Sequence, residues 1–589
     1  MTDVKIKQFR QILFWPLEIE KLSTCKGQQD IERLTSEFQA QFVKDGKWKR
    51  LHNLLSRVDS NLDKPANLVN RLSGQQLVPV DGEKEAEYAE LMFFHPFVRR
   101  FLYGSDAKPG KANDKPKPAM RLFSRDDIKK CSVSLMVEDY HCSIHLAIDR
   151  IHFYLFDHGV ALLVVELSAK NPLPLVQVQE LLDRFRRAYP PYWETENREA
   201  GHCLQWVRWN NYSNPKGSHY YCTSHFRDFA VQHQTPLPFE HWQYLLLPLV
   251  PWQTGLRPEV FAYRQIEDER MPFMAYLSLE DPRQLSRSDF VRLCFGNESG
   301  HSTELPYAES FLNDFEANHC LDRFWDPSMR HVDSFYQNSP GENALSTRYL
   351  CSGNGFVMIG KDGPGSFTDG KNGGLAHFRR HYFQMGLIAH FQRTTLLLCS
   401  QALAEAAANV ESHELNPRYE DIRVILERFH AFIHRVWFRE VSSQTPGREL
   451  FSLLTKHLDN QALFDRVKQQ VQDAQAFLVL QQQNRQTTTT TRLNVLATFG
   501  LATGLIGIFL AVDWSKFKGL QVSIPEKLDD IPIVGYVVIL VVLGMLLVIS
   551  KSVRLAEWLD KLSDPNLKFT LCIKQFYRWI VEKAKASFY

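Results

Sequence analysis

The sequence has little net charge, no cysteine pattern and no secretory leader. Its 69 lysines and arginines against 67 acids leave a formal charge of +2 over 589 residues, so charge indicates no nucleic-acid partner. None of the ten cysteines forms a CxxC pair, which suits reduced thiols in a cytosolic compartment better than a disulfide framework. Residues 1–21 contain no continuous apolar stretch and no small-residue cleavage site, so we expect no secretory signal.

Catalytic motifs are also missing. The sequence contains no HExxH, no GxGxxG and no motif of a serine or cysteine nucleophile, so we expect no enzyme and no required cofactor. The segment GFVMIGKD (355–362) comes near a phosphate-binding loop. However, Asp362 stands where that loop needs a hydroxyl, and the middle residues are apolar. We therefore predict a strand followed by a loop.

Long apolar runs are absent before residue 480, and two follow it. Residues 493–512 and 531–549 carry no charged side chain, and about 20 apolar residues suffice to span a bilayer. A pair of buried helices in a globular core is the alternative. Basic residues before the first run and after the second predict a multi-pass protein of the inner membrane, with both termini in the cytoplasm.

The first 375 residues predict an α/β domain. Apolar runs on both sides of residues 157–159 indicate a hairpin, and the spacing in residues 176–185 indicates an amphipathic helix. Residues 10–17 match residues 242–249 at four of eight positions. This match suggests two related halves, residues 1–235 and 236–375.

The remainder predicts long helices. One helix begins near residue 377, a second opens with Pro417, and a third begins near Arg448 and can continue to Val512 without a proline. A seam with heptad-like spacing lies on the third helix, at Phe464, Val467, Val471, Ala474 and Leu478. The fold class we expect is an α+β membrane protein, with a cytoplasmic α/β domain (1–375), a helical stalk (376–492), a transmembrane hairpin (493–550) and an amphipathic tail (551–589).

A polar stripe follows the same predicted helix on roughly the opposite side from Phe464. Its residues are spaced by three and four: Asn484, Thr487, Thr491, Asn494 and Thr498. Three apolar residues continue it: Leu501, Leu505 and Ile508. One interpretation is a water-lined pore with apolar constrictions and an acidic outer mouth, the mouth acids being Asp513, Glu526, Asp529 and Asp530. The other is a polar linker followed by an ordinary helix–helix interface.

One short segment has spacing compatible with a metal site. His219, Cys222 and His225 lie within HYYCTSH, and four nitrogen or sulfur ligands would make a structural zinc site. Histidine and cysteine in an aromatic core are the alternative.

The order of a cytoplasmic domain, long helices and two closely spaced apolar runs resembles the CorA magnesium transporter superfamily, best over residues 377–552. Asn494 and Thr498 occupy places that match the pore-lining helix of that family. The family's Gly-Met-Asn triplet is absent, and FLAVDWSKFKG stands there instead. The resemblance implies a homo-oligomer, a pentamer in that family, that passes divalent cations such as magnesium and is gated by its cytoplasmic domain. A ligand-activated membrane effector or sensor, for example in phage defence, and a membrane-anchored interaction protein without a pore are the alternatives. In each case membrane lipid is an expected partner, and a small-molecule signal would act on the cytoplasmic domain.

Overall fold

The structure is a computed structural model, and it falls into two compact units, Met1–Val471 and Gln472–Tyr589. It describes residues 4–23, 28–51, 90–103, 119–137, 140–156, 159–190, 203–211, 218–221, 235–254, 260–267, 269–297, 307–326, 346–363, 367–370, 373–408 and 416–511.

The described residues form fifteen strands of one sheet. The strands are β1 (Lys5–Ile19), β2 (Trp48–Leu51), β3 (Met120–Arg125), β4 (Ile128–Val137), β5 (Tyr140–Phe156), β6 (Val160–Ala169), β7 (Leu173–Pro174), β8 (Trp206–Asn211), β9 (Ser218–Tyr221), β10 (Val250–Pro251), β11 (Ala262–Gln265), β12 (Phe273–Leu279), β13 (Cys320–Trp325), β14 (Ser346–Cys351) and β15 (Gly355–Lys361). Ten of them follow one another in the order β13-β14-β15-β12-β1-β6-β5-β4-β8-β9. Within this row, β12 and β15 are parallel and the other neighbours are antiparallel.

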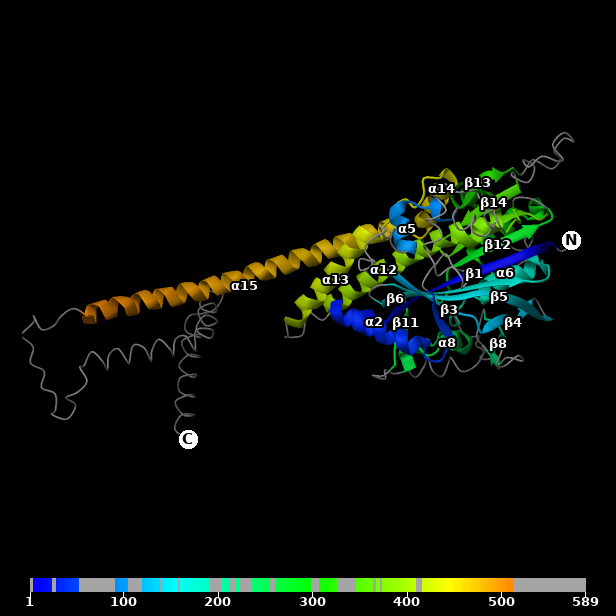
Figure 1. Cartoon of the computed structure of the whole chain (residues 1–589). Coiled ribbons are helices and arrows are strands. Elements are labelled where there is room, and N and C mark those ends of the chain that lie inside the picture. Colours follow the sequence, from blue (N-terminus) through cyan, green and yellow to red (C-terminus); the bar gives the residue numbers. More distant parts are fainter. Residues whose placement is uncertain are drawn as a thin grey trace, which may run out of the picture. The chain divides into compact units, whose positions relative to one another are not determined.

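The described residues also form twelve α-helices, several of which cover the sheet (Figure 1). They are α1 (Glu20–Ser23), α2 (Gln28–Val43), α5 (Pro96–Tyr103), α6 (Leu175–Arg184), α8 (Glu240–Leu246), α9 (Arg287–Phe295), α10 (Glu309–His319), α11 (Gly374–His377), α12 (Phe383–Ala408), α13 (Asn416–Arg435), α14 (Thr445–His457) and α15 (Asn460–Ala511). Short 3-10 turns occupy Trp252–Thr254 and Pro282–Gln284, and a π-helical turn occupies Phe378–Tyr382.

Strand β1 is buried on both faces of the sheet. Neighbouring side chains of a strand point to opposite faces. Phe14 packs on α12, with its ring 5.8 Å from that of Phe383, whereas Trp15 packs on Trp242 of α8 at 6.1 Å. Both β1 side chains are almost completely buried. The continuous apolar run of β1 therefore reflects its central place between two helical layers.

Helix α12 lies directly against the sheet. It contacts β1 and β6 on one side and α13 and α14 on others, and α12 and α13 run side by side in Figure 1. Gly386 permits this approach, because a Cβ atom there would stand 2.9 Å from the Met274 sulfur. Helix α12 thus connects the sheet with the other long helices of the first unit.

Several elements confirm the sequence predictions. Strands β5 and β6 pair as the predicted antiparallel hairpin, α6 covers most of the predicted amphipathic helix, and GFVMIGK forms the buried strand β15. Pro417 lies in the first turn of α13. The two segments that suggested a duplication differ, because residues 10–17 lie in strand β1 and residues 240–246 form helix α8.

The predicted continuous helix from Arg448 to Val512 is broken after α14. Asp459 adopts a positive φ of 54° between α14 and α15. Contacts with α12 hold this break: Arg393 donates a hydrogen bond to the carbonyl of Leu458, and Asn460 Nδ2 donates to the carbonyl of Ala389 at 3.0 Å. Neither long-range contact leaves a local signal in the sequence.

The expectation of a membrane fold is wrong for the part of the chain that the structure describes. Among those residues, no helix combines the length and the apolar character that crossing a bilayer requires. The first expected span falls within α15 up to Ala511, where Asn494, Thr498 and Thr503 interrupt the apolar run. The second expected span (531–549) and the expected tail (551–589) lie outside the described residues. The fold class is therefore corrected to a mixed α/β sheet domain with long helices.

A buried carboxylate fixes the turn that precedes α12. Glu166 of β6 is fully buried and accepts hydrogen bonds from Arg10 Nη1 at 2.8 Å, from Arg379 Nε at 2.6 Å and from Arg150 Nε. Burial alone would raise the pKa of Glu166, but the positive charges of Arg150, Arg379 and Arg10 outweigh it and hold the pKa well below its usual range. Arg379 lies in the π-helical turn, so this cluster connects the sheet to α12.

We expect Glu166→Gln to destabilise the protein by about 3–5 kcal/mol, because it leaves the three guanidinium groups without their buried anion. A carboxylate with a depressed pKa stabilises the fold above its unfolded pKa of about 4.3, and this contribution is lost as the pH falls below that value. Urea unfolding between pH 7 and pH 3 should therefore show a steeper loss for the natural chain than for Glu166→Gln.

Glu280→Gln is the matched control, because the Glu280 side chain is 81% exposed and its nearest cation, Lys7, is 3.6 Å away. Equal effects of the two substitutions on the free energy of unfolding would contradict the role assigned to Glu166.

Candidate functional site

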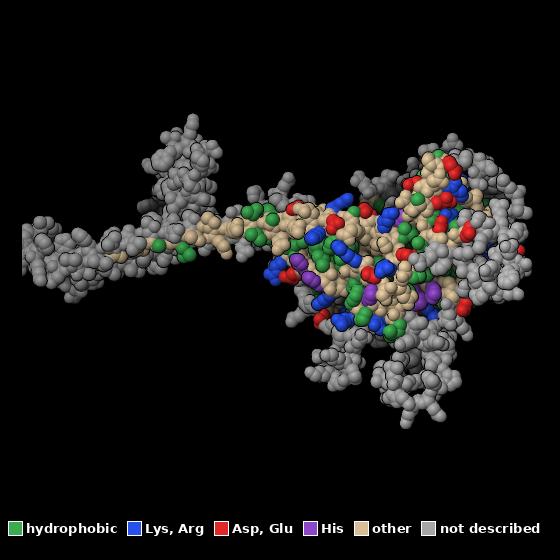
Figure 2. Space-filling view, turned by 90° about the horizontal axis from the view of Figure 1, so that it is seen from above, with side chains coloured by type: hydrophobic (Ala, Val, Ile, Leu, Met, Phe, Trp, Pro, Cys, Tyr) green, Lys and Arg blue, Asp and Glu red, His purple; other side chains and the backbone are tan. Residues whose placement is uncertain are grey.

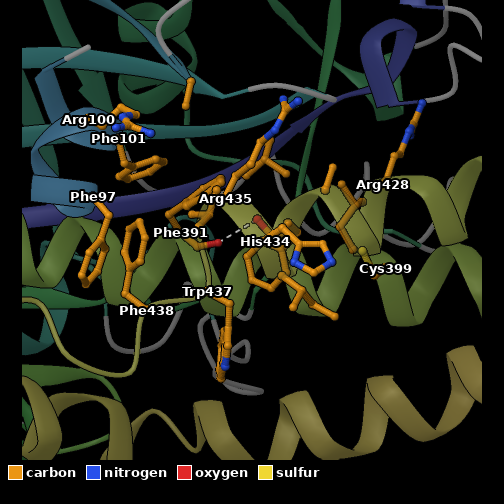
Figure 3. A pocket seen from close by; sticks show the side chains of 18 of the residues that line it. Phe97, Arg100, Phe101, Phe391, Cys399, Arg428, His434, Arg435, Trp437 and Phe438 are labelled. Carbon is orange, nitrogen blue, oxygen red and sulfur yellow. Dashed lines mark hydrogen bonds between the residues drawn. The ribbon is translucent and has the colours of Figure 1, made fainter. Parts of the chain in front are cut away.

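A cavity of about 1010 Å³ lies beside α5, α12 and α13 in the first unit (Figure 3). Its size is at the upper end of the range usual for small-molecule sites. Val160 of β6 and the segment 436–440 after α13 also line it, together with Glu32 of α2 and Ala119. The cavity is built by elements far apart in the sequence, which the packing of α12 brings together.

Aromatic side chains form one wall of the cavity. The ring of Phe101 lies 5.5 Å from that of Phe391 and 5.6 Å from that of Phe438, and Phe97 lies 5.5 Å from Phe438. Phe101, Phe391 and Phe438 are buried, whereas Phe97 is 50% exposed. The wall therefore extends from the core to the surface.

Arginines add positive charge to this apolar lining. The lining contains four arginines and two carboxylates. The arginines are Arg100, Arg428, Arg435 and Arg439, and the carboxylates are Glu32 and Glu440. Arg428 donates to the carbonyl of Ser23, and Glu440 lies 3.9 Å from both His95 Nε2 and Arg448 Nη1. Figure 2 shows regions of the surface where Lys and Arg side chains (blue) lie beside hydrophobic ones (green).

Three of these arginines are exposed and make no ion pair within the described part of the chain: Arg100, Arg435 and Arg439. A guanidinium without a carboxylate partner is suited to binding an external anion. The cavity therefore joins an apolar interior with a cationic opening.

Trp437 connects the cavity to the start of α15. Its indole lies 4.3 Å from the ring of Phe464 with an interplanar angle of 11°, and 5.9 Å from Phe432. Figure 3 shows Trp437 projecting away from the other labelled side chains. The wall of the cavity and the first turns of α15 thus share one aromatic cluster.

The cavity offers no activated nucleophile among the residues described. Burial raises the pKa of the Cys399 thiol to about 12, although the nearby Arg428 opposes this effect. A thiol with such a pKa is protonated and inert at neutral pH. The Cys399 thiol is therefore no nucleophile for covalent chemistry at neutral pH. The absence of enzyme activity stays a prediction.

The predicted pore-lining residues all lie on α15: Thr487, Thr491, Asn494, Thr498, Leu501, Leu505 and Ile508. Of these, only the side chain of Thr487 is described. It is exposed, and its hydroxyl donates to the carbonyl of Gln483 at 2.9 Å. The predicted mouth acids Asp513, Glu526, Asp529 and Asp530 lie outside the described residues. The structure therefore places this set on one helix without testing a pore.

The predicted zinc ligands are divided between described and undescribed parts of the chain. His219 lies in β9, whereas Cys222 and His225 lie outside the described residues. Within the described ranges, no group of three or more histidine, cysteine, aspartate and glutamate side chains could hold a metal ion. The zinc site stays a prediction.

Sequence reasoning missed the cavity entirely. Two segments carry the local signal, FVRRF (97–101) and RVWFRE (435–440), because each places arginines beside aromatic residues. They are more than 300 residues apart, so no spacing rule connects them. Only the tertiary fold shows that they share one site.

Comparisons with known proteins give a weak likeness only. No protein-family profile matches the sequence, and none of the curated proteins does. Among solved structures, the CorA magnesium transporter from Methanocaldococcus jannaschii matches with a TM-score of 0.16 and 11% sequence identity, over 50% of this chain and 94% of that chain. A superposition this poor carries no argument about fold or activity. Magnesium transport, gating and the inner-membrane location stay predictions from the sequence.

Proposed function

We propose that the protein self-associates along helix α15, so that several copies of the first unit act together as one ligand-responsive assembly. The observation that supports this proposal is a set of exposed apolar side chains on α15. Phe477 is 40% exposed and Leu480 is 60% exposed, and hydrophobic side chains are visible along this helix in Figure 2. Apolar side chains exposed together on a long helix are typical of an interface.

The first turns of α15 are already occupied on one side. Phe464, Val467 and Val471 are buried against the first unit. At about 100° per residue, Phe477 and Leu480 lie on the other side of the helix. The first turns of α15 therefore pack on the chain's own first unit, and Phe477 and Leu480 beyond them are left for a partner to cover.

The second face continues with coiled-coil spacing. Phe477, Leu480, Asn484 and Thr487 are separated by three, four and three residues, and the polar stripe extends this period. A second copy of α15 is the partner that fits, because identical stripes match each other in register. Polar residues at such core positions are known to fix register and the number of strands. Phe477 and Leu480 thus extend the predicted polar stripe toward the start of α15 with two apolar residues.

We expect Leu480→Glu to weaken self-association at least tenfold. Burial of a leucine contributes about 2 kcal/mol, and every 1.4 kcal/mol changes an association constant tenfold. Sedimentation velocity over a range of protein concentrations measures this change.

Gln475→Glu is the matched control, because Gln475 is exposed on α15 and lies well away from the Phe477 face. A natural chain that stays monomeric at every concentration would contradict the proposal, as would an equal loss in the two variants.

A second candidate function is the binding of a divalent cation by the assembled helices. The Thr487 side chain is exposed, and its hydroxyl donates a hydrogen bond to the carbonyl of Gln483. Hydroxyl and amide oxygens are ligands that magnesium and calcium accept. Copies of Thr487 on a shared helical face would bring several such oxygens together.

We expect millimolar Mg²⁺ to raise the Tm of the oligomer by a few degrees, and Thr487→Val to remove the increase, because binding to the folded state alone stabilises it. Differential scanning calorimetry with and without Mg²⁺ measures the shift. Thr490→Val is the control, since the exposed Thr490 hydroxyl makes the same backbone bond, to Gln486 at 2.9 Å, on a different side of the helix. An unchanged Tm shift in Thr487→Val would exclude this role.

A further inference from the structure

We propose that the cavity beside α12 and α13 binds an amphipathic anion: a molecule with an apolar body, such as an acyl chain, that ends in a carboxylate or phosphate. This inference concerns a separate site in the first unit and does not depend on self-association. It rests on the composition of the lining and on where its charges lie.

The interior of the cavity is suited to a hydrocarbon body. Phe391, Phe432 and Ile425 are buried lining residues with no polar atoms in their side chains, and Val160 is 2% exposed. The Thr395 hydroxyl is directed to its own helix, where it donates to the carbonyl of Phe391 at 2.9 Å. Burial of an apolar chain against such a lining is favourable at about 0.8 kcal/mol for each CH₂ group.

The opening of the cavity is suited to an anionic head. Arg100 on α5, Arg435 at the end of α13 and Arg439 in the following segment are exposed there and form no ion pair within the described ranges. A guanidinium binds carboxylate or phosphate through two parallel hydrogen bonds. The three arginines come from separate parts of the lining: α5, the end of α13 and the segment that follows it.

The aromatic wall of the cavity favours an apolar body over a nucleotide, while Thr395, His434 and Trp437 supply polar atoms elsewhere in the lining. Recognition of a base requires donors and acceptors that meet its polar edge, in addition to aromatic surfaces. The buried aromatic wall of Phe101, Phe391 and Phe438 carries no such groups. The Trp437 indole is directed to Phe464 instead of the cavity centre. An apolar body therefore fits this interior better than a heterocycle with a ribose.

The site is also placed to influence α15. An occupant in contact with Phe432 would press on the cluster that includes Phe464. Phe432 lies 5.9 Å from Trp437, whose indole stacks on Phe464, and Phe464 also lies 6.0 Å from Phe429 of α13. A close-packed core has low compressibility, so a small shift of one aromatic side chain is transmitted to its neighbours. A ligand in the cavity thus contacts the aromatic cluster against which the first turns of α15 pack.

The test is isothermal titration calorimetry on the full chain with two probes of equal chain length, laurate and dodecyltrimethylammonium, both below their micelle concentrations. We expect laurate to bind at least tenfold more tightly, because the two probes share an apolar body and differ in the sign of the head. Equal affinities would overturn the proposal. So would binding of adenosine monophosphate with no binding of laurate.

Variants locate the site. Arg435→Gln and Arg100→Gln should each weaken laurate binding several-fold, and both change exposed side chains that do not maintain the fold. Arg423→Gln is the control: Arg423 is exposed on α13 outside the cavity lining, and it pairs with Glu427 at 3.0 Å. Ala402→Trp should abolish binding by filling the cavity. Laurate affinity unchanged in all three cavity variants would overturn the assignment.

A further variant separates this proposal from self-association. The Leu480→Glu chain should bind laurate as the natural chain does, since Leu480 lies in the second unit and the cavity in the first. Loss of laurate binding in that variant would contradict the independence of the two sites.

Discussion

The buried carboxylate of Glu166 holds three arginines from different elements of the first unit, and the arrangement of the long helices depends on it. Arg10 comes from β1, Arg150 from β5 and Arg379 from the turn before α12. A buried anion of this kind must be matched by cations, since an unpaired buried charge is strongly destabilising. The cluster therefore fixes the position at which the chain leaves the sheet and α12 begins.

Because the position of α12 is fixed in this way, α12 in turn positions both candidate sites. Phe391, Thr395 and Cys399 on α12 line the cavity, whereas Arg393 and the Ala389 carbonyl hold the break before α15. Trp437 and Phe464 then join the cavity wall to α15. One helix thus positions a place for a small molecule and the start of the helix along which we propose that copies associate.

Local patterns in the sequence predicted the local structure well. The β5–β6 hairpin, α6, β15 and the start of α13 follow from alternation, helical spacing and proline placement, which depend on near neighbours. The break at Asp459 and the cavity depend on contacts between distant residues, and no spacing rule reports those. The membrane hairpin was predicted from length and absence of charge, and it is not supported where the structure describes the chain.

The sequence predicted the polar stripe on α15 and left open whether it lines a pore or forms a helix–helix interface. Exposure of Phe477 and Leu480 adds an apolar start to the stripe and favours contact between helices. The most direct test is photocrosslinking of the full chain with p-benzoylphenylalanine in place of Phe477 or, as the reference, of Gln475. We predict crosslinked dimers at position 477, with the bond mapped by mass spectrometry to α15 of a second copy, and few at position 475. No crosslinks at 477, or equal yields at the two positions, would contradict self-association along this face.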